Sequence, residues 1–228
     1  MPQHPALTLQ PHGQAAVDLL TAVRSGERLD TAAISALDPA ELVDDAARGA
    51  FWVDVYNALV LDQVNIGGLA GDVRRVPGFF RRTAVDIGGR SISLHVIEHG
   101  LLRGNRPAPW SLFRPLAGGD VRATWAVSKL DPRVHFALNC GARSCPPIAA
   151  YQAARWDAQL DLATRSYFAT ECVAKGDVVN LPWLLKLYAR DFPEPREFAA
   201  RYAPPPLAER LRTGARLGWT PYDWSVAR

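Results

Sequence analysis

Residues 135–147, which read HFALNCGARSCPP, hold the densest group of reactive side chains in the chain. One histidine, one asparagine, two of the three cysteines, an arginine and a serine fall within this stretch. Apolar and polar residues alternate over 134–140, and this period-two pattern predicts a half-buried strand. Gly141 ends the strand, and Pro147 is the better first residue of a following helix. The stretch therefore predicts a strand, a loop and a helix, with Cys145 exposed just before the helix.

The composition indicates one soluble globular domain. The chain has 228 residues, of which 48% are hydrophobic and 21% are charged, and this is typical of a protein with a well-buried core. The net charge of +3 comes from scattered basic residues, so we expect no nucleic-acid partner. We expect no membrane association either, because we find no signal peptide and no apolar run of about 18 residues. Three cysteines do not make a secreted disulfide framework, so the expected compartment is the cytoplasm.

The rest of the chain predicts several helices and few strands. Two alternating runs, 83–87 and 90–94, are joined by two glycines, which is a strong hairpin signal. One more short strand is expected at 177–182, and 69–82 predicts a loop with a helical turn. Residues 123–130 are compatible with a helix or a strand. Helices are expected over 13–23, 31–37, 39–65 (ended by Gly67-Gly68 and open to a break near Gly49), 94–103, 151–173, 183–192 and 207–211.

These elements predict the α+β class, with a mostly helical single domain around a small antiparallel sheet. Residues 1–50 are expected to form an N-terminal helical segment, and residues 51–228 a domain that carries the cysteine motif. Together the two parts are expected to make one globular unit. A cysteine at a helix start and a histidine on a strand also suggest, by analogy alone, a papain-like arrangement in permuted order.

Cys145 is the candidate nucleophile of the opening stretch. The thiolate is the reactive form of cysteine, and the positive end of a helix lowers the pKa of a nearby thiol. The alternative is a small buried side chain without reactivity. His135 is the nearest base, and it reaches Cys145 only if the loop at 141–144 folds back over the strand. His135 and Asn139 share one face of the predicted strand but stand roughly 13 Å apart, so they do not form a contacting pair.

A second polar group consists of His95, Glu98 and His99. Their spacing, H-x-x-E-H, is that of a zinc-hydrolase motif, which needs a further carboxylate such as Glu171. Otherwise these side chains form the polar face of an amphipathic helix, or line a pocket without metal. The two cysteines of the opening stretch have disulfide and half-zinc-site alternatives of their own. A reducing compartment argues against the first, and the lack of a second cysteine pair argues against the second.

Five stretches share one family pattern: FWVDVYNALVL (51–61), IEHGLLRG (97–104), DPRVHFALNCGARSCPPI (131–148), LYARDF (187–192) and PYDWS (221–225). Together they resemble the domain-of-unknown-function 547 family, which occurs in bacteria and, with an added N-terminal coiled coil, in plants. The resemblance spans 51–225 and implies no established activity. Asp54 stands where the family usually has asparagine, His95 lies outside the motif, and residues 1–50 show no sustained heptads. The motif positions that match are Asn57, Glu98, His99, Arg103, Pro132, Arg133, His135, Cys140, Gly141, Ser144, Cys145 and Pro146.

The leading hypothesis from the sequence is a cysteine-dependent hydrolase or acyl/peptidyl transferase without a cofactor or resident metal. Cys145 would attack a carbonyl of a small-molecule or peptide substrate, His135 or His99 would take its proton, and Glu98 would orient the imidazole. The candidates for binding the substrate are Arg103, Arg143, Asn57, Ser144 and Cys140. The alternatives are a non-catalytic binding or structural domain, in which Asn57 cross-links a core helix, and a zinc hydrolase that uses His95, His99 and Glu171.

Overall fold

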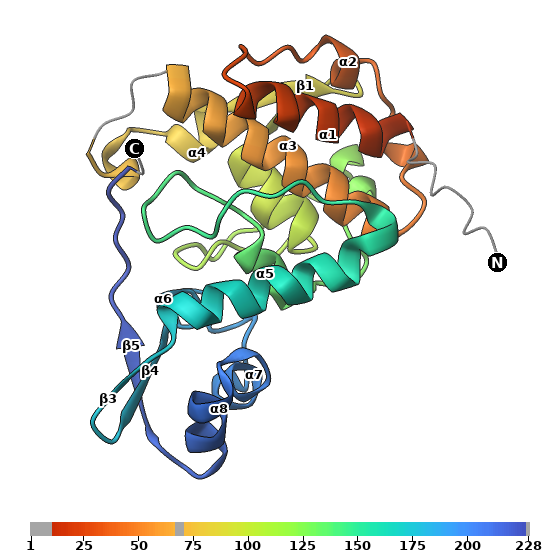
Figure 1. Cartoon of the computed structure of the whole chain (residues 1–228). Helices are drawn as coiled ribbons and strands as arrows, with labels where there is room; N and C mark the ends of the chain where they lie inside the picture. Colours follow the sequence, from red (N-terminus) through yellow and green to blue (C-terminus); the bar gives the residue numbers. More distant parts are fainter. Residues whose placement is uncertain (1–10, 67–70, 227–228) are drawn as a thin grey trace, which may run out of the picture.

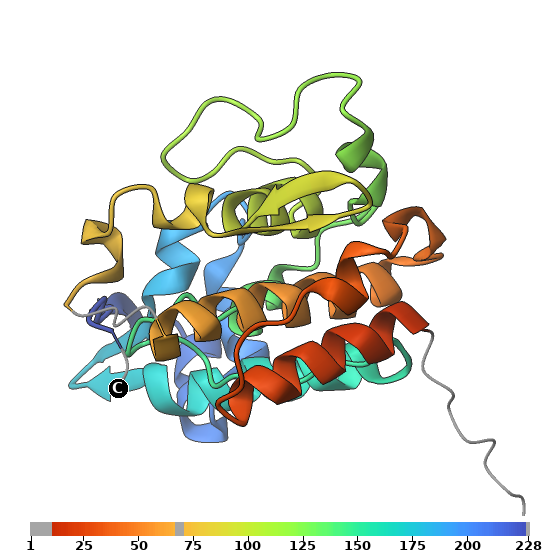
Figure 2. The same ribbon diagram turned by 90° about the horizontal axis from the view of Figure 1, so that it is seen from above.

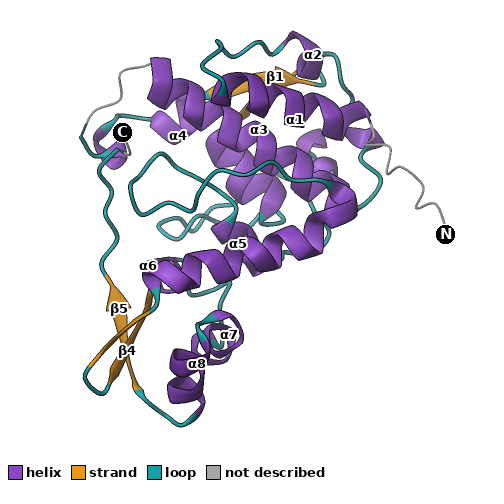
Figure 3. Cartoon of the chain, in the orientation of Figure 1, coloured by secondary structure: helices purple, strands orange, loops and turns teal. Residues whose placement is uncertain are grey.

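The computed structural model describes residues 11–66 and 71–226, and it shows a mostly helical chain with two small sheets (Figure 1). Colouring by secondary structure shows how far helices and loops outweigh strands (Figure 3). In Figure 1 the helices α1 and α3 lie on one side of α5, and α7, α8 and a three-stranded sheet lie on the other. The α+β class that the sequence predicts is therefore confirmed.

The N-terminal part packs its helices α1 (Pro11–Arg24) and α3 (Asp45–Ile66) side by side (Figure 2). Along the chain, α1 is followed by α2 (Ala32–Ser35) and by the 3-10 turn η1 (Pro39–Glu41). The Ala40 amide at the start of η1 donates to the Asp38 side chain at 2.9 Å. The predicted helix over 39–65 is broken before Asp45, where Asp44 accepts from the Ala47 amide at 2.8 Å. The break is therefore earlier than Gly49, and the predicted end at 67–68 lies outside the described residues.

Helix α3 is the centre of the larger hydrophobic core. Every residue from Phe51 to Val60 is buried, so the helix has no exposed face over this stretch. α3 is enclosed because α1, η3 and α5 all contact it. Gly49 is required at its first turns, because a methyl group there would collide with the Trp156 ring. The helix is thus a buried axis, and its polar side chains Asp54 and Asn57 are enclosed with it.

The surroundings of Asp54 explain how an aspartate replaces the asparagine of the resembled family without disturbing the core. Both carboxyl oxygens accept from the amide of Tyr151, at 3.0 and 3.1 Å. Burial raises the pKa of Asp54 to about 8, so the group is mostly protonated at neutral pH. A protonated carboxyl has nearly the shape of the asparagine amide that the resemblance expects here.

The predicted hairpin is confirmed as β1 (Ala84–Ile87) and β2 (Arg90–Ser93), antiparallel with Ala84 opposite Ser93. Two glycines with positive φ, 57° and 68°, form its turn. The expected loop with helical turns before it holds η2 (Val73–Arg75) and α4 (Phe79–Arg82). Ser93 caps the following helix by accepting from the Val96 amide at 3.3 Å. This helix, η3 (Val96–Leu102), is a π-helix rather than an α-helix, a form often found at functional sites.

The strand and helix predicted around the cysteines are wrong. Pro132–Phe136 form a 3-10 helix, η5, and residues 134–140 form no strand. The Asp131 side chain accepts from the Arg133 amide at 2.9 Å, and Pro132 takes the first helical position, so the chain turns instead of extending. Val134 to Leu138 are all buried, without alternation. Residues 146–152 form no helix, so Cys145 lies at no helix start and the papain-like analogy loses its basis.

The C-terminal part forms a second, aromatic-rich core beside α5 (Trp156–Glu171), which begins after the 3-10 turn η6 (Ala153–Arg155). Strand β4 (Val178–Pro182) is confirmed, and it pairs with β3 (Val173–Lys175) antiparallel and with β5 (Arg216–Thr220) in parallel. The predicted helices appear as α6 (Trp183–Leu187) and α8 (Pro205–Arg212), and α7 (Pro195–Tyr202) was not predicted. The ambiguous segment 123–130 holds the end of η4 (Val121–Trp125) and a loop.

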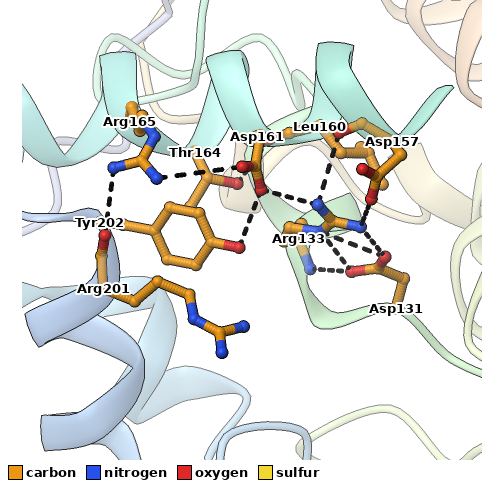
Figure 4. A network of polar contacts seen from close by, with 9 residues as sticks. All are labelled: Asp131, Arg133, Asp157, Leu160, Asp161, Thr164, Arg165, Arg201 and Tyr202. Atoms are coloured by element: carbon orange, nitrogen blue, oxygen red, sulfur yellow. Dashed lines mark hydrogen bonds and ion pairs between the residues drawn. The ribbon is translucent and has the colours of Figure 1, made fainter. Parts of the chain in front are cut away.

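Arg133 fastens η5 to α5, and thereby fixes the part of the chain that carries His135 (Figure 4). Its guanidinium donates to Asp131 at 2.6 Å, to Asp157 at 2.7 Å and to Asp161 at 2.7 Å. The three aspartates raise the pKa of Arg133 beyond its already high value, chiefly through the hydrogen bonds of Asp131. This network lines a second cavity of about 920 Å³ that contains none of the candidate catalytic residues.

Candidate functional site

A cavity of about 860 Å³ collects the candidate catalytic residues from segments far apart in the chain. η3 contributes Glu98 and His99, η5 contributes His135, and the loop after η5 contributes Cys140 and Cys145. A volume of this size suits a small-molecule or peptide ligand. The structure thus brings together the two stretches that the sequence singled out.

Cys145 and Cys140 form a close pair of free thiols on the cavity wall. Their Sγ atoms are 3.0 Å apart, and the Cys140 amide donates to Cys145 Sγ at 3.0 Å. The hydroxyl of Tyr222 lies 3.1 Å from Cys145 Sγ and 3.8 Å from Cys140 Sγ. Gly141 allows this loop, because its φ of 87° suits glycine and a methyl group there would press on Val64.

The surroundings of the pair favour a thiolate on Cys145 and a thiol on Cys140. Burial by itself raises the pKa of Cys145, but hydrogen bonds from Cys140, from Tyr222 and from the backbone outweigh it and lower the pKa. The hydrogen bond with Cys145, followed by burial, raises the pKa of Cys140 well above its ordinary value. Of the two thiols, Cys145 is therefore the one that ionises first as the pH rises.

The C-terminal segment 221–226 packs on the cysteine loop and positions Tyr222 beside the thiols. The Arg143 amide donates to Ser225 O at 2.7 Å, and the Asp223 amide donates to the Ser144 hydroxyl at 3.0 Å. Isolated bridges also join Ala142 to Val226 and Asp72 to Ser225. The cysteine loop is thus held between the end of the chain and the residues before α4.

Glu98 is a buried carboxylate that two tyrosines hold. Tyr56 donates to Oε2 at 3.3 Å, and Tyr188 donates to Oε1. Burial raises the pKa of Glu98, but His99, the Tyr188 hydroxyl, His135 and Arg103 together lower it below its usual value. Burial, and the charge of Glu98, raise the pKa of Tyr56 and Tyr188 well above normal, so both tyrosines remain hydrogen-bond donors.

The two histidines are fixed by a buried ion-pair network. The Arg103 guanidinium donates to Asp191 Oδ2 at 2.6 Å and lies 3.1 Å from His99 Nδ1. His135 Nε2 is 2.9 Å from the same Asp191 oxygen, and its ring stacks on Tyr188. Because a guanidinium only donates, His99 Nδ1 accepts and its proton resides on Nε2. Burial lowers the pKa of His99 to about 4, so this imidazole is neutral at pH 7.

Neither histidine forms the expected pair with Cys145. Within the described residues no hydrogen bond joins a histidine to either cavity thiol, and the partners of Cys145 Sγ are Cys140 and Tyr222. The thiols and Glu98 both act on the pKa of Tyr56, which therefore lies near both groups. The polar wall thus runs from the thiols past Tyr56 to Glu98, and from there to the histidines.

Four of the predicted substrate-binding residues do not line the cavity, and Cys140 is the one that does. Asn57 is buried on α3, where it donates to Ala137 O at 3.0 Å and accepts from the Asn139 amide at 2.9 Å, which supports the structural alternative. Arg103 is buried and paired with Asp191, and the Ser144 hydroxyl accepts from the Asp223 amide. Arg143 is 67% exposed and pairs with Asp223. Asn57 and Arg103 thus position residues of the site without lining the cavity themselves.

The zinc alternative loses its ligand set. Across 11–66 and 71–226 no group of three or more histidine, cysteine or acidic side chains is arranged to hold a metal ion. The rings of His95 and His99 lie edge to face with 4.8 Å between their centroids, but Glu171, the third ligand that this alternative named, is at the end of α5 and not on the cavity wall.

Sequence reasoning missed four polar residues of the site: Tyr56, Tyr188, Asp191 and Tyr222. All four lie within the stretches that carry the family resemblance, FWVDVYNALVL, LYARDF and PYDWS. That position is a signal that could have found them. Their partners are 42 to 90 positions away in the sequence, so spacing alone gave no hint of the contacts.

The comparisons with known proteins give a family and no activity. The family described as "Protein of unknown function, DUF547" matches residues 40–168, which is more than half of the chain. No curated protein and no solved structure matches the chain. None of the helices in the described residues is long and apolar enough to cross a membrane. The match includes both cysteines, Glu98, His99 and His135, so the resemblance is confirmed, and the chain belongs to the DUF547 family.

Proposed function

We propose that this protein is a cysteine-dependent hydrolase or acyl transferase with Cys145 as its nucleophile. The observation that carries the proposal is the set of donors around Cys145 Sγ, on the wall of a cavity that also holds Glu98 and two histidines. Such donors stabilise a thiolate without an adjacent base. The Cys–His pair expected from the sequence is therefore replaced by a thiolate that Cys140 and Tyr222 hold.

The reaction begins when the Cys145 thiolate attacks a carbonyl carbon of an ester or amide. A carbon–sulfur bond forms, and the electron pair of the carbonyl double bond moves to oxygen. When this intermediate collapses, the bond to the leaving alkoxide or amine breaks, and the leaving group takes a proton from an acid on the cavity wall. Water or an acceptor amine then cleaves the thioester and restores the thiolate.

The acid of this reaction belongs to the wall formed by Glu98, His99 and His135, which line the same cavity. His99 carries its proton on Nε2, since Arg103 occupies Nδ1. His135 is held by Asp191 through Nε2. The two histidines thus have different roles open to them, with His99 as a neutral donor and His135 as the partner of a carboxylate.

Acylation by a small activated ester tests the proposal. We expect p-nitrophenyl acetate to leave one acetyl group on the peptide that contains Cys145 when the protein is quenched in acid and mapped by mass spectrometry. Cys172 is the internal control, because it is buried and its pKa is raised to about 11 by that burial. Equal acetylation of Cys172 and Cys145, or acetyl groups on lysines alone, would contradict an activated thiol.

A further inference from the structure

Several aromatic rings line the cavity that holds Cys145, and those of Phe79, Trp183, Tyr222 and Trp224 are called its aromatic flank. Tyr222, which contacts the thiol, packs against Trp224 with 4.4 Å between ring centroids. Phe79 and Trp183 line the same cavity from α4 and α6. An apolar group that displaces water from aromatic walls of this kind makes the free energy of binding more favourable. A ligand is therefore expected to place an apolar group beside the nucleophile.

The same cavity carries a positive charge that no acidic side chain of the described residues pairs with. Arg74 and Arg81 both line it, but Arg74 is paired with Asp72 and lies over the ring of Trp224 at 4.8 Å. For Arg81 no ion pair is formed with any of the residues 11–66 and 71–226. Burial and then the charge of Arg81 lower the pKa of His95, so the guanidinium is near the histidine side of the cavity. Arg81 is the cation that a bound ligand can neutralise.

The acidic group of the cavity sets the direction of a charged ligand. Glu98 is a carboxylate on the polar wall, next to His99. It repels a ligand carboxylate, whereas Arg81 on α4 attracts one. A ligand that contacts both the aromatic flank and Arg81, and that presents a carbonyl to Cys145, therefore carries an apolar group and a carboxylate on the two sides of that carbonyl. This order fits an acyl group joined through an amide to an amino acid.

We infer that the substrate class of this site is an N-acylated amino acid or a short acyl-peptide, whose apolar acyl group fills the aromatic flank and whose carboxylate binds Arg81. The inference rests on the proposed function for the reaction, and it goes further by naming the ligand. It assigns Arg81 as the residue that selects for a carboxylate. A guanidinium suits this task, because it matches the two oxygens of a carboxylate.

Binding to the Cys145→Ser protein, which holds the ligand without turnover, tests this inference. The probes are N-dodecanoylglycine and its uncharged amide, followed by calorimetry and by the fluorescence of the tryptophans that line the cavity. We expect the carboxylate to bind roughly three- to tenfold more tightly than the amide, because Arg81 is exposed and water weakens its charged hydrogen bond. Arg81→Gln should remove that preference. Arg82→Gln is the matched control, because Arg82 is the exposed neighbour on α4 that does not line the cavity.

Equal binding of the two probes, or an equal loss of preference in Arg82→Gln, would overturn the role of Arg81. Failure of both probes to bind would overturn the acyl-amino-acid class as a whole. These outcomes are separate from the acetylation of Cys145 by a small ester, which needs neither the aromatic flank nor Arg81. A protein that is acetylated at Cys145 but binds neither probe retains its proposed chemistry and loses the proposed substrate.

Discussion

Replacing Cys145 with serine is expected to slow the release of p-nitrophenol from p-nitrophenyl acetate by a factor on the order of 10³ or more. The hydroxyl of serine is far less acidic than a thiol, so the donors around this position no longer hold an anion. The fold should persist, because serine is similar in size and its hydroxyl still accepts from the Cys140 amide and from Tyr222. Stopped-flow absorbance gives the rate, and thermal unfolding gives the stability.

Two further variants grade this effect. Tyr222→Phe removes one donor to Cys145 Sγ but leaves the ring packed on Trp224, so we expect the rate to fall about tenfold at neutral pH. Cys172→Ser is the matched control, and it should leave the rate unchanged, because Cys172 is buried in the second core. A Cys145→Ser protein that keeps its rate but melts at a lower temperature would instead favour the non-catalytic alternative.

Replacing Arg103 with methionine is expected to lower the free energy of unfolding by about 3–5 kcal/mol, the cost of breaking a buried ion pair. The Arg103 side chain is 2% exposed and that of Asp191 is fully buried. Burial raises the pKa of Asp191, but His135 and Arg103 more than reverse this and hold it well below the usual range. Without Arg103 the carboxylate loses its shortest partner, and His99 loses the donor at Nδ1. Denaturation in urea measures the change.

Arg106→Gln is the control for this substitution. Arg106 reaches the other oxygen of Asp191 at 3.3 Å, but its side chain is 50% exposed, so its loss should cost less than about 1 kcal/mol. An Arg103→Met protein as stable as Arg106→Gln would contradict the buried network. A large difference between the two would support the role we assign to Arg103, which is to position the histidines from behind and not to bind substrate.

Local signals explain the parts of the fold that the sequence predicted. The hairpin follows from two glycines between alternating runs, and the helix after it follows from Ser93, whose hydroxyl caps the first turn. The sequence also identifies the two stretches that carry the candidate catalytic residues, 97–104 and 131–148, because histidine, cysteine and acidic side chains are concentrated there. Their meeting in one cavity depends on the fold and is a structural result.

The error at 134–140 has an equally local cause. The segment begins with Asp131-Pro132-Arg133, in which the aspartate caps the Arg133 amide and pairs with its side chain. The same aspartate-x-arginine pattern begins η2 at Asp72 and η4 at Asp120, each with a hydrogen bond to the amide two residues later. This capping pattern predicts a 3-10 turn, and it outweighed the alternation of apolar residues that suggested a strand.

The partners of the thiol lay beyond sequence reasoning for a different reason. Tyr222 is 77 positions from Cys145, and Asp191 is 88 positions from Arg103. Neither contact leaves a trace in spacing, since each depends on how the C-terminal core and the last segment return to the N-terminal half. The sequence therefore suggested a histidine as the base, and the structure places a tyrosine and a second cysteine at the sulfur instead.

The pH dependence of alkylation tests the activated thiol most directly. Only the thiolate reacts with iodoacetamide, so the rate for each cysteine rises through its own pKa. Because the pKa of Cys145 is lowered from 9.0 and that of Cys172 is raised to about 11, we expect Cys145 to be labelled first, with a midpoint below pH 9. Peptide mapping of the folded protein resolves the two rates. Labelling of Cys145 with a midpoint at or above pH 9, or at the same rate as Cys172 near neutral pH, would contradict a thiolate held by Cys140 and Tyr222.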